Sequence, residues 1–89
     1  MNHTTIQSLI SNNEYDKAIE QIDLLLHESP CDDEAYYLKA KIYQRQSKWS
    51  NAIETYKKAI ELNKDSKAVT ALEMLYDILN SMNNEVIET

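Results

Sequence analysis

The chain has 89 residues, with no Gly, no Phe and a single proline, Pro30. A sheet protein of this length needs tight turns built from Gly, Pro or Asn, and only Asn is plentiful here, so we expect an all-α fold. The formal net charge of −6 argues against binding to nucleic acid or to an anionic membrane surface, because phosphate contacts require an excess of Lys and Arg.

The charge is distributed unevenly along the chain. Residues 1–34 contain eight acids and one base, residues 35–64 contain two acids and seven bases, and residues 65–89 contain five acids and one base, which gives segment charges of −7, +5 and −4. The basic middle can attract an acidic partner, or it can pair with the acidic first segment of its own chain. We favour the internal pairing as the larger effect.

No feature of the sequence indicates export or membrane insertion. Cys31 is the only cysteine, and a lone thiol is typical of a reducing compartment. The first fifteen residues lack the basic start and apolar run of a signal peptide. No segment approaches the roughly 20 apolar residues of a membrane helix. We therefore expect a soluble cytoplasmic protein.

Apolar residues recur at helical spacing in successive segments of the chain. The first pattern covers residues 6–10 and stops at 11–13. The second covers 15–26, and its helix should end near His27 or Glu28, because proline disfavours helix in the residue that precedes it. Asp32 or Asp33 can cap the start of a third helix by accepting from free amide groups.

The second half of the chain continues the pattern. The third helix breaks at residues 46–48, a fourth covers 49–62, and Asp65 or Ser66 can cap a fifth. Short linkers make sequential helices antiparallel neighbours. The sequence thus predicts a single domain over residues 1–82, composed of a hairpin over 3–28, a hairpin over 33–62 and a closing helix over 66–82. Residues 83–89 lack periodicity, and we expect them to fray.

The second helix of the first hairpin aligns with the second helix of the next hairpin under a constant shift of the sequence. The aligned pairs are Tyr15 with Trp49, Ala18 with Ala52, Ile19 with Ile53 and Leu26 with Ile60. A helical hairpin that repeats every ~34 residues resembles the tetratricopeptide repeat family. The best match is the repeat over residues 33–64, where the aromatic and small residues expected by the family fall at Tyr36, Ala40, Tyr43, Ala52, Tyr56 and Ala59.

The chain departs from the family pattern at several positions. Lys39 occupies a family leucine site, with Leu38 beside it. Asn13 and Ser47 replace the turn glycine, and Asn tolerates a left-handed backbone better than Ser does. After residue 66 the match is one helix, and the repeat frame slips. The resemblance implies a short solenoid of about five helices, stacked as antiparallel hairpins.

The resemblance also implies a non-catalytic module that binds a protein or peptide on a concave surface, and the Lys and Arg side chains placed there predict an acidic ligand. Carried onto this chain, that surface holds Glu34, Tyr37, Lys41, Gln44 and Arg45, flanked by His3 and Gln7. The alternative is a solvated charged face with Tyr37 half-packed. The two remain open, because only one of the adjacent tyrosines Tyr36 and Tyr37 can point fully into the core. A chaperone-tail clamp is disfavoured, because Leu38 and Leu72 stand where polar residues are required.

We expect no catalytic site, no metal site and no cofactor. Neither His3 nor His27 has a carboxylate at a recognisable spacing, and metal binding needs three or four convergent ligands. A phosphate-binding loop requires Gly, which the chain lacks.

The predicted fifth helix suggests an alternative function. Its apolar stripe is wider than one contact requires, and Met74, Ile78 and Met82 form a possible dimer face. The chain is then a self-associating scaffold, a homodimer. Alternatively, Val86 and Ile87 fold back over that face in a monomer.

Overall fold

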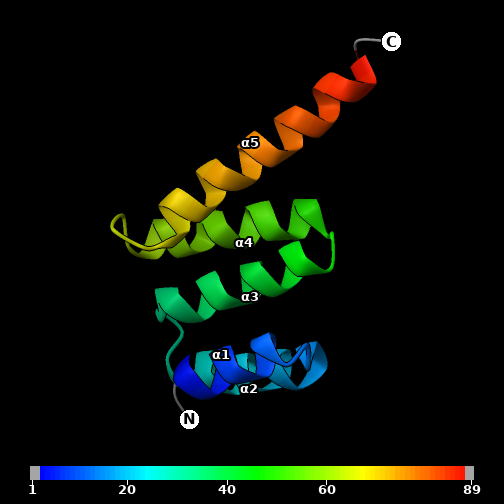
Figure 1. Cartoon of the computed structure of the whole chain (residues 1–89). Helices are drawn as coiled ribbons and strands as arrows, with labels where there is room; N and C mark the ends of the chain where they lie inside the picture. The colour runs from blue at the N-terminus through cyan, green and yellow to red at the C-terminus, as the bar shows by residue number, and fades with distance from the viewer. Residues whose placement is uncertain (1–2, 88–89) are drawn as a thin grey trace.

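The computed structural model describes the backbone of residues 3–87 and the side chains of residues 3–82, and this part of the chain is all-α, as predicted. The helices follow one another in a simple stack, with the α1–α2 hairpin at one end and α5 at the other (Figure 1). Within the described residues they are α1 (His3–Ser11), α2 (Tyr15–Glu28), α3 (Asp33–Arg45), α4 (Trp49–Leu62) and α5 (Ala68–Ile87).

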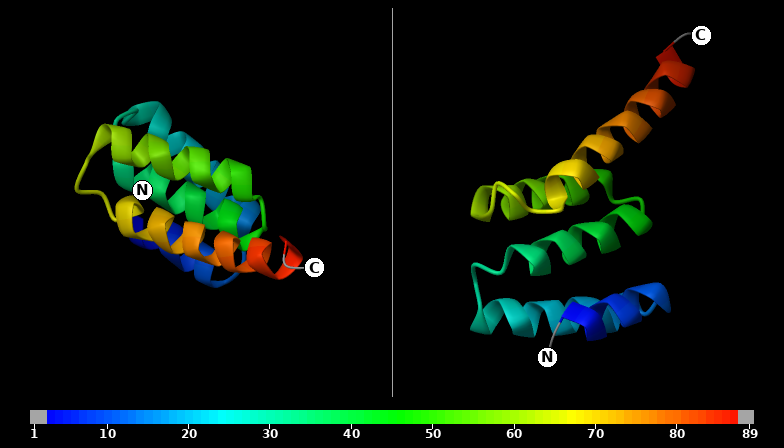
Figure 2. Two further views of the ribbon diagram at one scale, coloured as in Figure 1. Left: turned by 90° about the horizontal axis from the view of Figure 1, so that it is seen from above. Right: turned by 60° about the vertical axis from the view of Figure 1, so that its left-hand side comes forward.

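The helices alternate between two sides of the stack. Seen from above, α1 and α5 lie on one side and α2 and α4 on the other, with α3 between them (Figure 2). The part of the chain that contains these helices measures 48 × 28 × 16 Å. Such a thin body cannot hold one deep core, which suits contacts made mainly between neighbours in sequence.

The turn inside the first hairpin is a Schellman motif centred on Asn13. The Glu14 N–H donates to the Leu9 carbonyl at 2.8 Å, and the Asn13 N–H donates to the Ile10 carbonyl at 2.9 Å. Asn13 has a φ of 62°, in the left-handed region, as its place at the family's glycine site predicts. The hydrogen bonds satisfy carbonyl groups that the end of α1 would otherwise leave unpaired.

The same turn recurs one repeat later, around Ser47. Its φ is 60°, and the two hydrogen bonds have the same pattern, from Lys48 N–H to Tyr43 O at 2.9 Å and from Ser47 N–H to Gln44 O at 3.0 Å. Two hairpins with different side chains therefore share one backbone turn.

The connections between hairpins also repeat. Asp32 caps α3, because its Oδ1 accepts from the Ala35 N–H at 3.1 Å; this decides between the two candidate aspartates. At the equivalent position of the next repeat, the Ser66 Oγ accepts from the Ala68 N–H at 3.0 Å. Each side chain satisfies an amide at a helix start, where no intrahelical acceptor exists.

In the part of the chain whose side chains are described, two buried clusters form the core on either side of α3. The first core cluster joins α1, α2 and α3, and its buried members are Ile6, Ile10, Ala18, Ile22, Ala35, Leu38 and Ile42. The second core cluster joins α3, α4 and α5, and its buried members are Ala40, Ala52, Tyr56, Ala59, Ala68, Leu72 and Leu75. Alanines occur where helices approach closely, and α3 contributes to both clusters, so it is the central element.

Helix α5 differs from the sequence expectation at both ends. It begins at Ala68 rather than at residue 66, and its last residue is Ile87, five residues beyond the predicted end at 82. No Gly or Pro follows Met82, so the sequence contains no strong terminator there. Fraying of residues 83–89 stays a prediction, because side chains from residue 83 onward and residues 88–89 lie outside the described part.

The slip of the repeat frame in α5 is visible in its burial. A strict shift by one repeat from Ala35 and Ile42 would bury Val69 and Tyr76, yet Tyr76 is 43% exposed. The buried residues among the described side chains of α5 are Ala68, Leu72 and Leu75, and of these Leu72 alone is one repeat beyond a buried residue of α3, Leu38. Helix α5 thus keeps the connection of a repeat but only part of its packing face, and its second half diverges from α4 (Figure 1).

Candidate protein-binding face

Tyr37 stands at the centre of the face formed by α1, α3 and α5. Its side chain is half-buried and packs against both core clusters. The Tyr37 ring lies 6.2 Å from the Tyr56 ring at an interplanar angle of 47°, a favourable tilted arrangement. Tyr36 is also half-buried. Neither of the two adjacent tyrosines points fully into the core, because the thin stack gives both rings a partial contact.

Two cations lie on α3 beside this ring. The Lys41 Nζ is 5.5 Å from the Tyr37 ring centroid, within the range of a cation–π contact. Arg45, one turn further on, is exposed. Among the residues whose side chains the structure describes, neither Lys41 nor Arg45 forms an ion pair. Both charges thus remain available to a ligand.

Gln44 is held by the core. Its Oε1 accepts from the Tyr56 hydroxyl at 2.7 Å, and Tyr56 is only 1% exposed. Burial, with a smaller contribution from the neighbouring Tyr37, raises the pKa of Tyr56 to about 12. The phenol is therefore neutral at physiological pH and acts as a hydrogen-bond donor. The contact fixes the Gln44 side chain, and its amide N–H groups have no acceptor among the described residues.

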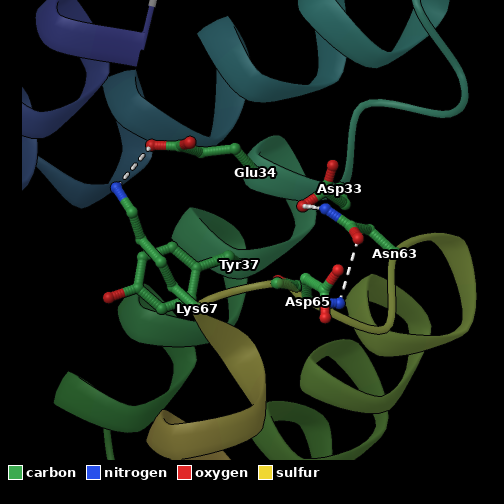
Figure 3. Close-up of a pocket in the computed structure, with 7 residues that line it drawn as sticks. Asp33, Glu34, Tyr37, Asn63, Asp65 and Lys67 are labelled. Carbon is green, nitrogen blue, oxygen red and sulfur yellow. Dashed lines mark hydrogen bonds and ion pairs between the residues drawn. The ribbon is translucent and has the colours of Figure 1, made fainter.

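The end of the face near the start of α3 is polar and acidic (Figure 3). The Lys67 Nζ lies 3.4 Å from the Glu34 Oε2, and the Asn63 Nδ2 donates to the Asp33 Oδ2 at 3.3 Å. These side chains, with Asp65, surround a depression of about 210 Å³. Acids at the start of α3 and Arg45 at its end both complement the helix dipole.

Three further depressions connect the helices of this face. One of about 320 Å³ lies between α1 and α3 and includes Gln7 from α1. A second of about 300 Å³ joins Tyr37 and Lys41 to Met74. A third of about 370 Å³ has a lining of Lys41, Gln44, Arg45, Trp49 and Ile78.

The predicted contact residues of α3 therefore share depressions with two members of the predicted dimer face, Met74 and Ile78. The helical patterns of α3 and α5 had predicted two separate sites. Helix periodicity alone does not reveal that α5 crosses the stack with this side toward α3. Met74, Ile78 and Met82 are 59%, 43% and 45% exposed, respectively. The side chains of Val86 and Ile87, expected as a possible cover, lie outside the described residues.

One contact at the edge of the face was missed by sequence reasoning. The His3 Nε2 lies 2.9 Å from the Asp32 Oδ2, although the two residues are far apart in the chain. Asp32 therefore caps α3 and also contacts the start of α1, so it ties two helices together. The spacing rules considered for His pairs apply within one helix and carry no signal for such a contact. His3 is thus engaged within the chain rather than free beside the groove.

Comparison with known proteins identifies the family of this helical stack. The profile described as tetratricopeptide repeat matches residues 33–66, which contain α3, α4 and the connection to α5. A solved structure, the solution NMR structure of Bacteroides fragilis protein BF1650, is 37% identical over 97% of this chain and 93% of that chain, with a TM-score of 0.85. The chain belongs to the tetratricopeptide repeat family. A comparison with curated protein sequences finds no match.

Membership of the tetratricopeptide repeat family indicates a protein-interaction module.

Two observations on neighbouring residues of α3 fit the predicted departures from the family pattern. Leu38 is buried, whereas Lys39 at the family leucine site extends to Asp23 of α2, with Nζ and Oδ1 3.2 Å apart.

The described His, Cys, Asp and Glu residues form no group suited to a metal ion. Among the described residues, no helix combines the length and apolarity needed to cross a membrane.

Proposed function

We propose that this tetratricopeptide repeat protein is a non-catalytic module that binds a peptide or a surface segment of a partner protein with the face formed by α1, α3 and α5. The predicted contact residues are Glu34, Tyr37, Lys41, Gln44 and Arg45. They differ in their availability to a ligand.

Tyr37, Lys41 and Arg45 form the centre of the proposed site. The observation that carries the proposal is the depression of about 320 Å³ between α1 and α3, whose lining includes all three of these residues. Tyrosine offers contact area at low entropic cost, and unpaired cations can bind carboxylates. Glu34 and Gln44 already have partners in Lys67 and Tyr56, so we expect them to contribute less.

The direct test is capture of proteins from the lysate of the native cell by wild type and by Lys41→Glu. We expect the variant to lose an acidic partner and to keep nearly the same melting temperature, because Lys41 is only partly buried and forms no ion pair with the described residues. Tyr37→Ala is a weaker choice, because Tyr37 packs against both core clusters and its loss would also reduce stability.

Lys57→Glu provides a matched control. Lys57 is an exposed lysine of α4, and it lines none of the depressions described above. This variant makes the same change in net charge as Lys41→Glu. A partner lost from both variants would indicate only a response to total charge. A partner retained by Lys41→Glu would contradict the proposed site.

Self-association through α5 is the second candidate function. The observation that favours it is the exposure of Met74, Ile78 and Met82 on one helix. It predicts that static light scattering gives the mass of a dimer rather than that of a 10.4 kDa monomer. A monomer at every concentration tested would remove this candidate and leave the binding of a separate partner.

A further inference from the structure

The two depressions of about 300 Å³ and 370 Å³ that join α3 to α5 are together called the channel below. The channel has two chemically different walls. The α3 wall presents Lys41 and Arg45, and Lys67 stands at the start of α5. The α5 wall presents Met74 and Ile78, which are 59% and 43% exposed. Each wall contributes to the same depressions of about 300 Å³ and 370 Å³. A ligand in this channel therefore meets charge on one side and apolar surface on the other.

We propose that the channel binds an acidic amphipathic segment of a partner protein. Apolar side chains of the segment contact Met74 and Ile78, and its carboxylates pair with Lys41 and Arg45. This inference rests on the proposed function and specifies the chemistry of the partner. It also assigns a ligand-binding role to residues that sequence analysis placed on a dimer face.

Charge complementarity selects this occupant. Lys41 and Arg45 have no ion-pair partner among the described side chains, so an acidic segment meets them without breaking an existing pair. Basic or neutral apolar segments would leave the two cations desolvated and unpaired, which is costly. Methionine adapts to partner side chains of varied shape, so the apolar wall tolerates sequence variation in the ligand.

The spacing of the two walls matches such a segment. Lys41 and Arg45 are four residues apart on α3, and Met74 and Ile78 are four residues apart on α5. Each pair is separated by about 6 Å along its helix axis. Side chains on one face of an extended or helical peptide repeat at a similar interval. One segment can therefore present an acidic row to α3 and an apolar row to α5.

A second copy of the chain fits this face less well. The apolar wall belongs to α5, so a symmetric dimer through it would place two α5 helices side by side. Residues 65–89 contain five acids and one base, and Glu73 and Asp77 are exposed on α5. Like charges brought together across an interface oppose association.

The test is selection from a displayed library of random linear peptides on the full chain. We expect the enriched peptides to combine Asp or Glu with Leu, Ile, Val, Phe or Met. A representative peptide is then synthesised, and its Kd is measured by fluorescence anisotropy. Both Lys41→Glu/Arg45→Glu and Met74→Ser/Ile78→Ser should weaken binding at least about tenfold, because each removes one wall.

Matched controls come from exposed residues outside these depressions. Lys57→Glu/Lys64→Glu makes the same change in net charge as Lys41→Glu/Arg45→Glu, and Leu24→Ser on α2 replaces an apolar side chain that is 56% exposed. Both controls should bind the peptide as wild type does. Circular dichroism melting of every variant identifies loss of folding. All the altered side chains are half-buried or exposed, so we expect melting temperatures close to that of wild type.

The outcomes distinguish the two proposals. Dependence on Lys41 and Arg45 without dependence on Met74 and Ile78 overturns the amphipathic ligand and leaves the proposed function standing. Independence from both pairs, or no enrichment of acidic apolar peptides, overturns both. If light scattering gives a wild-type dimer that Met74→Ser/Ile78→Ser converts to a monomer, a second copy covers the wall and the inference is wrong.

Discussion

The two hairpins of this protein have the same backbone conformation at their turns, but they bury different side chains. Their left-handed turn residues, Asn13 and Ser47, have φ values of 62° and 60°, and their second helices each begin immediately after a residue with nearly the same φ and ψ. Ala18 and Ala52, one repeat apart, are both fully buried. The repeat therefore fixes the helix geometry at the positions of the turn and of the closest helix approach.

One clear difference lies in a pair of equivalent positions. In the first hairpin the pair is Ile10 and Ile22, both in the first core cluster. In the second hairpin the equivalent pair is Gln44 and Tyr56, joined by a hydrogen bond of 2.7 Å. The same frame thus accepts an apolar pair or a hydrogen-bonded pair, and the second choice places a polar group on the candidate binding face.

The largest expected effect comes from emptying the apolar version of this pair. Ile22→Ala should reduce the free energy of unfolding by about 2–5 kcal/mol, because Ile22 is fully buried and the thin stack leaves few atoms to fill the cavity. Urea unfolding followed by circular dichroism measures the loss. A loss below about 1 kcal/mol would mean that the first hairpin collapses around the cavity and is more adaptable than its apolar packing indicates.

Overpacking tests the feature that the hairpins have in common. Ala18→Leu and Ala52→Leu should each cost about 1–3 kcal/mol, because both alanines are fully buried between closely packed helices. Equal losses in urea unfolding would support one shared helix approach. A neutral result at Ala52 alone would mean that the second hairpin has room the first lacks, and that Ala52 is not at the close contact.

Much of the fold follows from local chemistry in the sequence. Pro30 marks the end of α2 near Glu28, Asp32 caps α3, and Asn13 and Ser47 take the place of turn glycines. These signals act within a few residues, so they can be read from a single chain. The end of α5 at Ile87 could not, because the sequence offers no capping residue or helix breaker to mark it.

The candidate face was predictable only one helix at a time. Helix periodicity places Tyr37, Lys41 and Arg45 together, since they share one face of α3. It cannot predict that Met74 and Ile78 come from α5 to line the same depressions, because that depends on how α5 crosses the stack. The contact between His3 and Asp32 was missed for the same reason.

The hydrogen-bonded pair is tested by Tyr56→Phe. Removing the hydroxyl should cost about 0.5–1.5 kcal/mol at neutral pH, because Gln44 loses its donor while the aromatic packing is retained. Tyr15→Phe is the matched control in the first hairpin, since the Tyr15 hydroxyl donates to Asn13 in an exposed position. We expect an effect within about 0.5 kcal/mol there. Comparable losses in both variants would show that the Gln44 contact adds nothing special.

The same variant predicts a pH dependence. Burial raises the pKa of Tyr56 from 10.0 to about 12, so the folded state holds the phenol proton more tightly than the unfolded state. The resulting stabilisation is fully present below pH 10 and is lost as pH rises toward about 12. Lysine titration affects wild type and Tyr56→Phe alike. The difference between their unfolding free energies should therefore shrink over this range, and a constant difference would contradict the raised pKa.

The smallest effect separates the two turn residues. Ser47 and Asn13 hold the same left-handed backbone, but Asn tolerates it better than Ser does. Ser47→Gly should therefore stabilise the protein by about 1 kcal/mol or less, after the entropic cost of glycine in the unfolded chain is subtracted. Asn13→Gly should be closer to neutral, and Asn13→Ser should destabilise. Equal gains from the two glycine variants in thermal melts would show that the turns carry equal strain. The two turns would then be equivalent in energy as well as in backbone, and the differences between the hairpins would lie in their buried side chains, such as Ile10 and Ile22 in place of Gln44 and Tyr56.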